Sequence, residues 1–388
     1  MAYWKSAVTT AMVVVAGVVT GPRAARAQGC VLIRQNGPLL GQGMSPDLAP
    51  GQWEFSFSTR TSTADKHYNG DVEQVQRQQL GTYVLNKQHA FDFALRYQAS
   101  HRLGFTASIP LIDASWALPY PLAPAPGDRV PQRGVGLGDL TVTGRYWVLD
   151  PLKHARGNVE VGLGIKLPTG SADDTAFYPT LAGSWSDKAI DQSAQPGDGG
   201  VGMLFDTQGY WRFGKSMVYA NGSYLSNPKN TNGTPSILVG LLGPAANTPA
   251  NANKLVNSVA DQYLFRIGGA TIIPGTRHLS GSLAFRAEGL RRYDLFGRSD
   301  GFRRPGYELY LEPGFSYAYK GQSISFNVPI GLYRNRLPDP YTGAHGDATF
   351  PDYVFLGSYS VRFGKGTSPL KGPQQKPAVP SPPVANNN

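Results

Sequence analysis

Charged side chains recur inside apolar segments of this chain, where they alternate with large hydrophobic residues. Glu54, for example, lies between Trp53 and Phe55. Carboxylate, guanidinium and ammonium groups placed in this way can pair with one another, hold water or attract ions. We expect one shared polar interior to be lined by Glu54, Arg60, Asp92, Arg96, Asp139, Arg145, Glu160, Lys166, Asp206, Arg266, Arg286, Glu288, Glu308, Glu312 and Arg362.

The histidines offer no arrangement for catalysis or for binding a metal ion. A serine nucleophile needs a histidine within hydrogen-bond reach and a third group that orients it, and zinc needs closely spaced ligands. The sequence pattern places every histidine in a loop or turn, away from any strand serine with an acidic or amide neighbour. We therefore predict no enzyme activity, no cofactor and no metal. These residues are His67, His89, His101, His154, His278 and His345.

The segments that carry the charged residues alternate apolar and polar side chains with period two. Such alternation over roughly 8 to 12 residues, bounded by Gly, Pro, Asn and Asp, is typical of strands with two different environments. The pattern predicts about twelve strands, at 53–58, 91–97, 103–109, 139–149, 159–167, 201–211, 217–225, 263–273, 279–289, 307–319, 323–333 and 352–363.

The connections between these segments alternate between short and long. Short periplasmic turns and long external loops are the asymmetry of barrels in the outer membrane of Gram-negative cells. We therefore predict an all-β fold, a transmembrane antiparallel up-and-down β-barrel over residues 52–363. The short connections are 100–101, 212–216, 274–278 and 320–322, and the long ones are 62–90, 111–138, 168–200 and 226–262.

Aromatic residues fall toward the two ends of the predicted strands. Tyrosine and tryptophan favour both membrane–water interfaces, which predicts two aromatic girdles in contact with outer-membrane lipid. The girdle at the short turns would hold Trp53, Tyr97, Tyr146, Trp211, Tyr317 and Tyr319, and the one at the long loops Tyr224, Tyr263, Tyr307 and Tyr353.

The beginning of the chain has the features of an export signal. Lys5 precedes an apolar stretch at 7–20, which is too short for a membrane-spanning helix, and Ala25-Arg26-Ala27 suits signal peptidase. Residues 1–27 are predicted to be a cleaved signal peptide. Cys30 is the one cysteine, so no intramolecular disulfide can form, and its preceding residues are a poor context for lipidation.

Two further segments flank the predicted barrel. Residues 28–51 are apolar but aperiodic, which predicts a periplasmic segment or a plug for the barrel. The last predicted strand ends in an aromatic residue, Phe363. We expect the barrel assembly machinery to recognise this strand. Residues 364–388 are rich in proline and are predicted to be disordered.

The positive charges of the chain do not indicate a nucleic-acid partner. The formal net charge is +10, but the basic residues are scattered among acidic ones without an aromatic-interleaved patch. Two arginine clusters, Arg291-Arg292 and Arg334 with Arg336, stand near predicted loop bases. They are expected to attract anionic solutes, to bind lipopolysaccharide phosphates, or simply to be solvated.

Three glycine-rich motifs add a resemblance. These are Gly136-Leu137-Gly138-Asp139-Leu140-Thr141-Val142, then Lys166-Leu167-Pro168-Thr169-Gly170, and then Gln195-Pro196-Gly197-Asp198-Gly199-Gly200. With them the chain resembles the phenol-degradation meta-pathway outer-membrane family. The resemblance implies a barrel that transports small, in part aromatic, compounds.

Two functional hypotheses follow. The first is an outer-membrane channel for small solutes, narrowed by the loops 111–138 and 168–200. The second is a closed structural or adhesive barrel without transport. A channel keeps a continuous wet path, whereas a structural barrel pairs its charges across a sealed interior. The near balance of interior charges predicts little ion selectivity, unless loops add a ring of one sign.

Two prolines interrupt predicted strands. Pro313 and Pro329 each lack a backbone N–H and remove one hydrogen bond from the strand ladder. We expect bulges or a register break at both positions.

Overall fold

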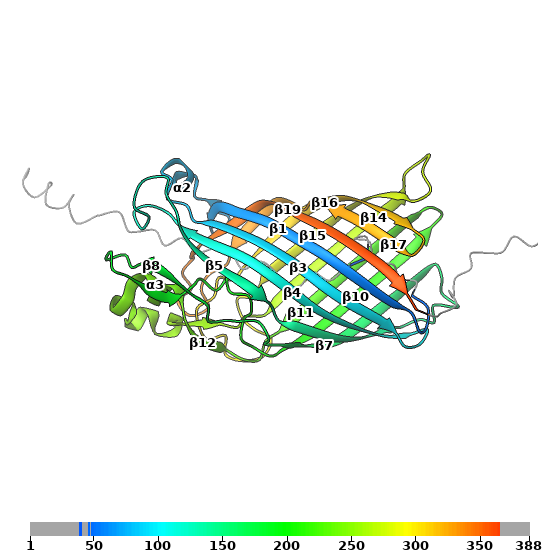
Figure 1. The fold of residues 1–388 in the computed structure, drawn as a ribbon, viewed down its shortest axis with the longest axis horizontal. Helices are drawn as coiled ribbons and strands as arrows, with labels where there is room; N and C mark the ends of the chain where they lie inside the picture. Colours follow the sequence, from blue (N-terminus) through cyan, green and yellow to red (C-terminus); the bar gives the residue numbers. More distant parts are fainter. Residues whose placement is uncertain (1–38, 41–45, 47, 365–388) are drawn as a thin grey trace, which may run out of the picture.

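The period-two alternation produces one antiparallel sheet that closes on itself. The computed structural model describes residues 39, 40, 46 and 48–364, so 1–27, Cys30, most of 28–51 and 365–388 lie outside the described part. The sheet closes because β1 pairs with β19 from Trp53–Phe363 to Asn69–Asp347 (Figure 1). Its strands are β1 (Trp53–Asn69), β3 (Leu85–Gln98), β4 (Leu103–Leu118), β5 (Val130–Leu137), β6 (Leu140–Trp147), β7 (Gly157–Leu167), β10 (Gly202–Phe213), β11 (Ser216–Ser226), β14 (Gln262–Ile272), β15 (Leu279–Leu290), β16 (Gly306–Tyr319), β17 (Gln322–Asn327), β18 (Ile330–Arg336) and β19 (Asp347–Phe363).

Two positions in the barrel wall are each filled by a pair of short strands. β5 and β6 both pair with β4, and β17 and β18 both pair with β16 and β19. Counting each pair as one strand gives a barrel of twelve strands. The predicted fold class and strand number are confirmed.

The prolines explain one of these interruptions. β17 ends at Asn327 and β18 begins at Ile330, so the break expected at Pro329 is confirmed. The break expected at Pro313 is absent on the β15 side, where Pro313 pairs with Leu283 in unbroken register. The carbonyl of Pro313 accepts a hydrogen bond from Val328 N at 3.0 Å, so its donor-less edge faces the same break. One interruption therefore accommodates both prolines.

Several strands extend further outward than the sequence predicted. β1, β3 and β4 extend into the segments 62–90 and 111–138, which the sequence predicted to be loops. The loop prediction was wrong for these parts of the two segments. Beyond the membrane neither face of a strand must be apolar, so the alternation that reveals strands weakens. For the same reason His67 and His89 lie in β1 and β3, not in loops.

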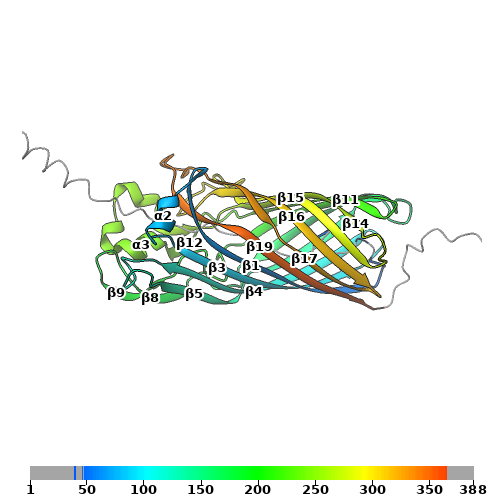
Figure 2. The same ribbon diagram turned by 90° about the horizontal axis from the view of Figure 1, so that it is seen from above.

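The outer ends of the strands carry a folded cap. A buried apolar cluster holds it together, with Trp116, Tyr178, Ile190, Ile237 and Phe302 almost without solvent contact. Figures 1 and 2 show the cap at the end of the barrel opposite the short turns. Its elements are β2 (Val72–Glu73), α2 (Val75–Gln79), β8 (Thr175–Pro179), β9 (Trp185–Ala189), β12 (Thr231–Pro235), α3 (Ile237–Leu242), the 3-10 helices η1 (Gly243–Ala246) and η2 (Pro249–Lys254), and β13 (Val256–Ser258).

The exterior of the barrel is apolar and the interior is polar, the inverse of a soluble protein. Leu163, Phe265 and Phe285 are at least half exposed in the middle of their strands, whereas the charged residues between such positions are buried. This exterior is the surface that lipid requires of a membrane-spanning barrel. Among the described residues, no helix combines the length and apolarity needed to cross a membrane.

The aromatic residues are distributed as the sequence predicted at the short-turn end. Trp53, Tyr146, Trp211, Tyr317 and Tyr319 are all exposed there. At the other end Tyr353 is exposed, while the hydroxyl of Tyr224 donates to Asp261 at 2.6 Å.

A lysine scan across the exterior tests the membrane position of the barrel. Phe285 is 61% exposed near the middle of β15, and Tyr319 is 46% exposed at the end of β16. We expect Phe285→Lys to lower the free energy of unfolding by roughly 2–4 kcal/mol and Tyr319→Lys by about 0–1 kcal/mol. Reversible urea unfolding in phospholipid vesicles measures both losses. Equal losses at the two positions would contradict a bilayer centred on Phe285.

Candidate functional site

The candidate site is the interior of the barrel, where the predicted charged residues lie. All of them are buried except Arg145, Asp206 and Arg362, which are half-buried. The alternation positions those that lie in strands, because inward and outward side chains alternate along each strand, whereas Asp139 lies between β5 and β6. Their partners come from strands that are distant in sequence, and three groups of pairs can be distinguished.

The first group, the central network, joins two walls of the barrel. Arg60 in β1 forms an ion pair with Glu288 in β15, although these strands are not neighbours in the wall. Arg286 Nε donates to the same carboxylate at 2.6 Å. Glu312 continues the chain, since Arg286 lies 3.6 Å and Arg266 2.8 Å from its oxygens.

The central network also holds a residue of the N-terminal segment. Arg266 Nη1 donates to the carbonyl oxygen of Leu40 at 2.6 Å, and Tyr219 Oη lies 3.2 Å from Arg266 Nη2. Leu40 has no exposed surface and packs in a cluster with Trp147 and Tyr210. A leucine from outside the strands therefore lies in the lumen.

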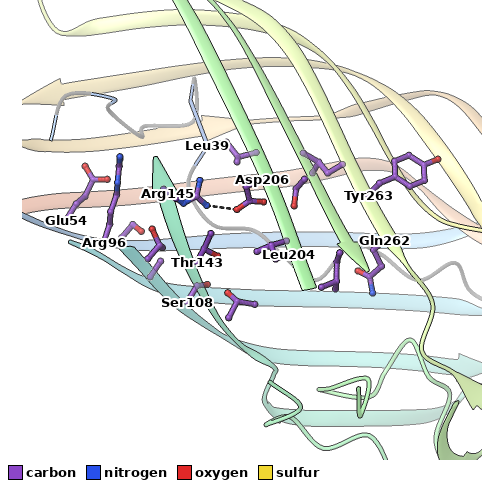
Figure 3. A pocket seen from close by; sticks show the side chains of 17 residues that line it. Leu39, Glu54, Arg96, Ser108, Thr143, Arg145, Leu204, Asp206, Gln262 and Tyr263 are labelled. Atoms are coloured by element: carbon purple, nitrogen blue, oxygen red, sulfur yellow. Dashed lines mark hydrogen bonds and ion pairs between the residues drawn. The ribbon is translucent and has the colours of Figure 1, made fainter. Parts of the chain in front are cut away.

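The second group lies on the opposite side of the lumen. Arg96 Nη2 lies 3.0 Å from Glu160 Oε1, and Arg145 Nη2 donates to Asp206 at 2.7 Å (Figure 3). Glu160 also accepts a hydrogen bond from Gln208. These pairs join β3 to β7 and β6 to β10.

Glu308, Glu54, Arg362 and Asp92 belong to neither of these two groups. Glu308 pairs with Arg334 at 3.2 Å and accepts a hydrogen bond from Tyr310, and Glu54 pairs with Arg362 at 3.1 Å. Asp92 accepts a hydrogen bond from Ser108 Oγ at 2.6 Å.

The expected surface role of the arginine pair near β18 is wrong. Arg334 and Arg336 are 8% and 2% exposed. Arg334 is committed to Glu308 and Asp352, and Arg336 donates to the carbonyl oxygen of Pro305 at 2.9 Å. Both turn inward because the strand alternation continues through β18.

The three glycine motifs converge on one point, which we call the glycine node (Gly138, Asp139, Gly170, Gly197 and Asp198). The carboxylate of Asp139 accepts hydrogen bonds from Gly170 N at 3.0 Å and Asp198 N at 3.1 Å. An ideal Cβ on Gly170 would lie 2.8 Å from the Cα atoms of both Gly138 and Gly197, so glycine is required by space. The node closes the gap between β5 and β6.

The glycine node also positions the last predicted cation. Lys166 forms an ion pair with Asp198 and lies 3.6 Å from Asp139. Sequence reasoning did not place Asp198, Gly170 or Gly197 in the site. The signal for them was present, because all three lie in the motifs that carried the family resemblance.

Several spaces remain between these side chains. A cavity on the side of the second group leaves about 90 Å³ for the centres of water molecules and is lined by Leu39, Glu54, Arg96 and Asp206 among others (Figure 3). Two smaller spaces of about 30 Å³ each lead from it toward the cap. Gln262 lines all three spaces. A separate vestibule of about 450 Å³ lies at the short-turn end and shares no lining residue with the cavity.

The comparison with known proteins identifies the fold. No protein-family model and no curated protein matches the sequence, so the family suggested by the motifs is not confirmed. The COG4313 outer membrane channel from Pseudomonas putida F1 is similar in structure, with a TM-score of 0.51 and 12% identity over 85% of this chain and 99% of that chain. A FadL homologue from Pseudomonas aeruginosa aligns with a TM-score of 0.44 and 8% identity over 87% of this chain and 99% of that chain. The fold is that of an outer-membrane barrel.

The central network predicts an order of stability among charge variants. Glu288→Gln leaves Arg60 buried without its carboxylate and leaves Arg286 with Glu312 alone, and should cost about 3–5 kcal/mol. Arg60→Met should cost less, because Arg286 still neutralises Glu288. As a control, Lys66→Met breaks a pair with Asp352 whose partners are about one third exposed, and should cost less than about 1 kcal/mol. Urea unfolding in detergent micelles measures all three, and a loss for Arg60→Met above that for Glu288→Gln would contradict the network.

Proposed function

We propose that this chain is an outer-membrane channel for small solutes, observed with its path closed near the short-turn end. The observation that carries the proposal is the row of three spaces that all have Gln262 in their lining. It extends from Arg303 in the cap, past Asp198 at the glycine node, to the cavity in the lumen. A barrel whose only task is structural has no need of such a row.

The paired charges are the observation that favours the rival, a closed structural barrel. They do not fill the whole interior, however. The central network uses β1, β14, β15 and β16, whereas the cavity is lined from β1 through β3, β4, β6, β10 and β11 to β14. The network therefore braces one side of the lumen and leaves the other side to the cavity.

The closure lies between the cavity and the vestibule. Glu54 lines the cavity and Arg362 lines the vestibule, and these cross-strand neighbours in β1 and β19 form an ion pair along one wall of the lumen. Two described residues of the N-terminal segment line the two spaces, Leu39 the cavity and Pro46 the vestibule. This arrangement supports the interpretation of residues 28–51 as a plug, whose displacement would join the two spaces.

The class of solute follows from the dimensions and from similarity. Spaces of this size suit small molecules, and leucines among the cavity residues supply apolar contact. The fold shared with the Pseudomonas putida channel and the resemblance of the motifs to a phenol-degradation family support small, aromatic or hydrophobic solutes. Such a channel belongs in the outer membrane of a Gram-negative cell.

Two further partners belong to the same proposal. The exterior of the final strand, with Tyr353, Phe355 and Phe363 exposed, suits recognition by the barrel assembly machinery. Arg291, exposed at the outer end of β15, suits the phosphates of lipopolysaccharide.

Removal of the N-terminal segment tests the channel and its plug together. We expect the mature chain to give small single-channel steps in a planar lipid bilayer, and the chain lacking residues 28–47 to give steps several-fold larger. Benzyl alcohol in the bath should reduce both. A chain lacking residues 365–388 is the control and should match the mature chain. Folded protein that remains silent in every form would favour the structural barrel.

A further inference from the structure

The vestibule at the short-turn end differs in charge from the rest of the interior. Its lining includes Arg212, Lys215, Lys320 and Arg362, together with His278, but no carboxylate among the described residues. Elsewhere in the lumen each sign is balanced by the other. The vestibule is thus a positively charged chamber that precedes a mixed one.

Two of these cations have no acidic partner within the described part of the chain. Neither Lys215 nor Lys320 lies within ion-pair distance of a described carboxylate, and Lys320 lies 5.1 Å from the ring centroid of Tyr319. Arg362 is paired with the carboxylate of Glu54, a residue that lines the cavity. The ammonium groups of Lys215 and Lys320 are therefore available to an anion.

The surrounding turns strengthen the same sign. The connections 99–102, 148–156, 214–215, 273–278 and 320–321 contain six lysines and arginines and one carboxylate, Asp150. A rim of one sign around a concave, low-dielectric mouth concentrates ions of the opposite sign. It is the ring of one charge that would give a balanced lumen an ion preference.

The remaining lining of the vestibule provides hydroxyl donors and an apolar surface. Ser280, Ser316 and Ser323 contribute hydroxyl groups, while Met217 and Ala318 contribute apolar area. Cations beside hydroxyls suit a carboxylate, and the apolar side chains suit a small apolar body.

We propose that this vestibule binds small organic anions, molecules that join a carboxylate to an aromatic or alkyl body. The inference rests on the proposed channel function and narrows its solute class from small aromatic or hydrophobic compounds to those that also carry a carboxylate. The vestibule holds the anion next to the Glu54–Arg362 pair, and beyond that pair Arg96 and Arg145 line the cavity.

Binding is measured apart from conduction, so that the two proposals fail separately. The probe is benzoate, titrated by calorimetry into the folded mature chain in dodecyl maltoside micelles. Lys215→Gln/Lys320→Gln should weaken benzoate binding roughly tenfold. Lys153→Gln, on the same rim but outside the vestibule lining, is the matched control and should stay within about twofold. Heat-modifiable migration of each variant on a denaturing gel verifies that the barrel is folded.

Three further ligands decide the class. Benzyl alcohol lacks the charge, inorganic phosphate lacks the apolar body, and dihexanoyl phosphatidylglycerol presents a lipid headgroup. Benzoate should bind more tightly than all three. The proposal is overturned if any of them matches benzoate, or if the control weakens binding as much as the double variant. Benzoate binding with a silent bilayer would support the site while refuting the channel.

Discussion

The constraint on which this structure depends is that lipid surrounds the whole wall of the barrel. Every outward position at membrane depth must be apolar, so each charged side chain of the strands points into an interior that only twelve strands enclose. That interior is too narrow to solvate so many charges separately. Pairs such as Arg60 with Glu288 and Arg96 with Glu160 are the result. A buried ion pair stabilises the fold little more than apolar residues in its place would, but removal of one partner is costly. The network therefore restricts substitution at its positions more than it adds to the free energy of unfolding.

At three irregularities of the wall, a proline on the neighbouring strand has no backbone N–H to lose. Pro313 presents its donor-less edge to the break between β17 and β18, and Pro110 does the same at the break between β5 and β6, where its carbonyl accepts from Gly138 N at 2.7 Å. Pro351 lies at the register shift between β1 and β19. Proline on one strand thus coincides with an interruption or bulge on the next. At the β5–β6 break the glycine node replaces the lost ladder with hydrogen bonds to Asp139.

The sequence was sufficient for the barrel but not for the contacts within it. Alternation with period two predicts the face of each residue, and the charged residues that it assigns to the interior are buried or half-buried. It carries no information about partners: Arg60 and Glu288 are 228 positions apart, and only the tilt and radius of the closed sheet bring them together. The cap was missed for another reason. Its strands and hairpins have no lipid on either side, so Trp116 and Tyr178 pack in a core with no simple period.

The two ends of the barrel treat charge in opposite ways, and the difference bears on gating. In the cap, Arg304 Nη1 donates to Asp191 Oδ1 at 2.9 Å and Arg303 Nη1 donates to Asp294 Oδ1 at 2.7 Å. Both arginines are buried, so the charges of the outer end are neutralised within a packed core. At the short turns Lys215 and Lys320 remain exposed beside an open vestibule. The wall itself is tied along the full length of β1 and β19. A change that joins the vestibule to the cavity therefore falls to groups inside the lumen, such as Leu40 and the side chains of Trp147 and Tyr210 that pack with it, because the strands themselves are held by a continuous ladder.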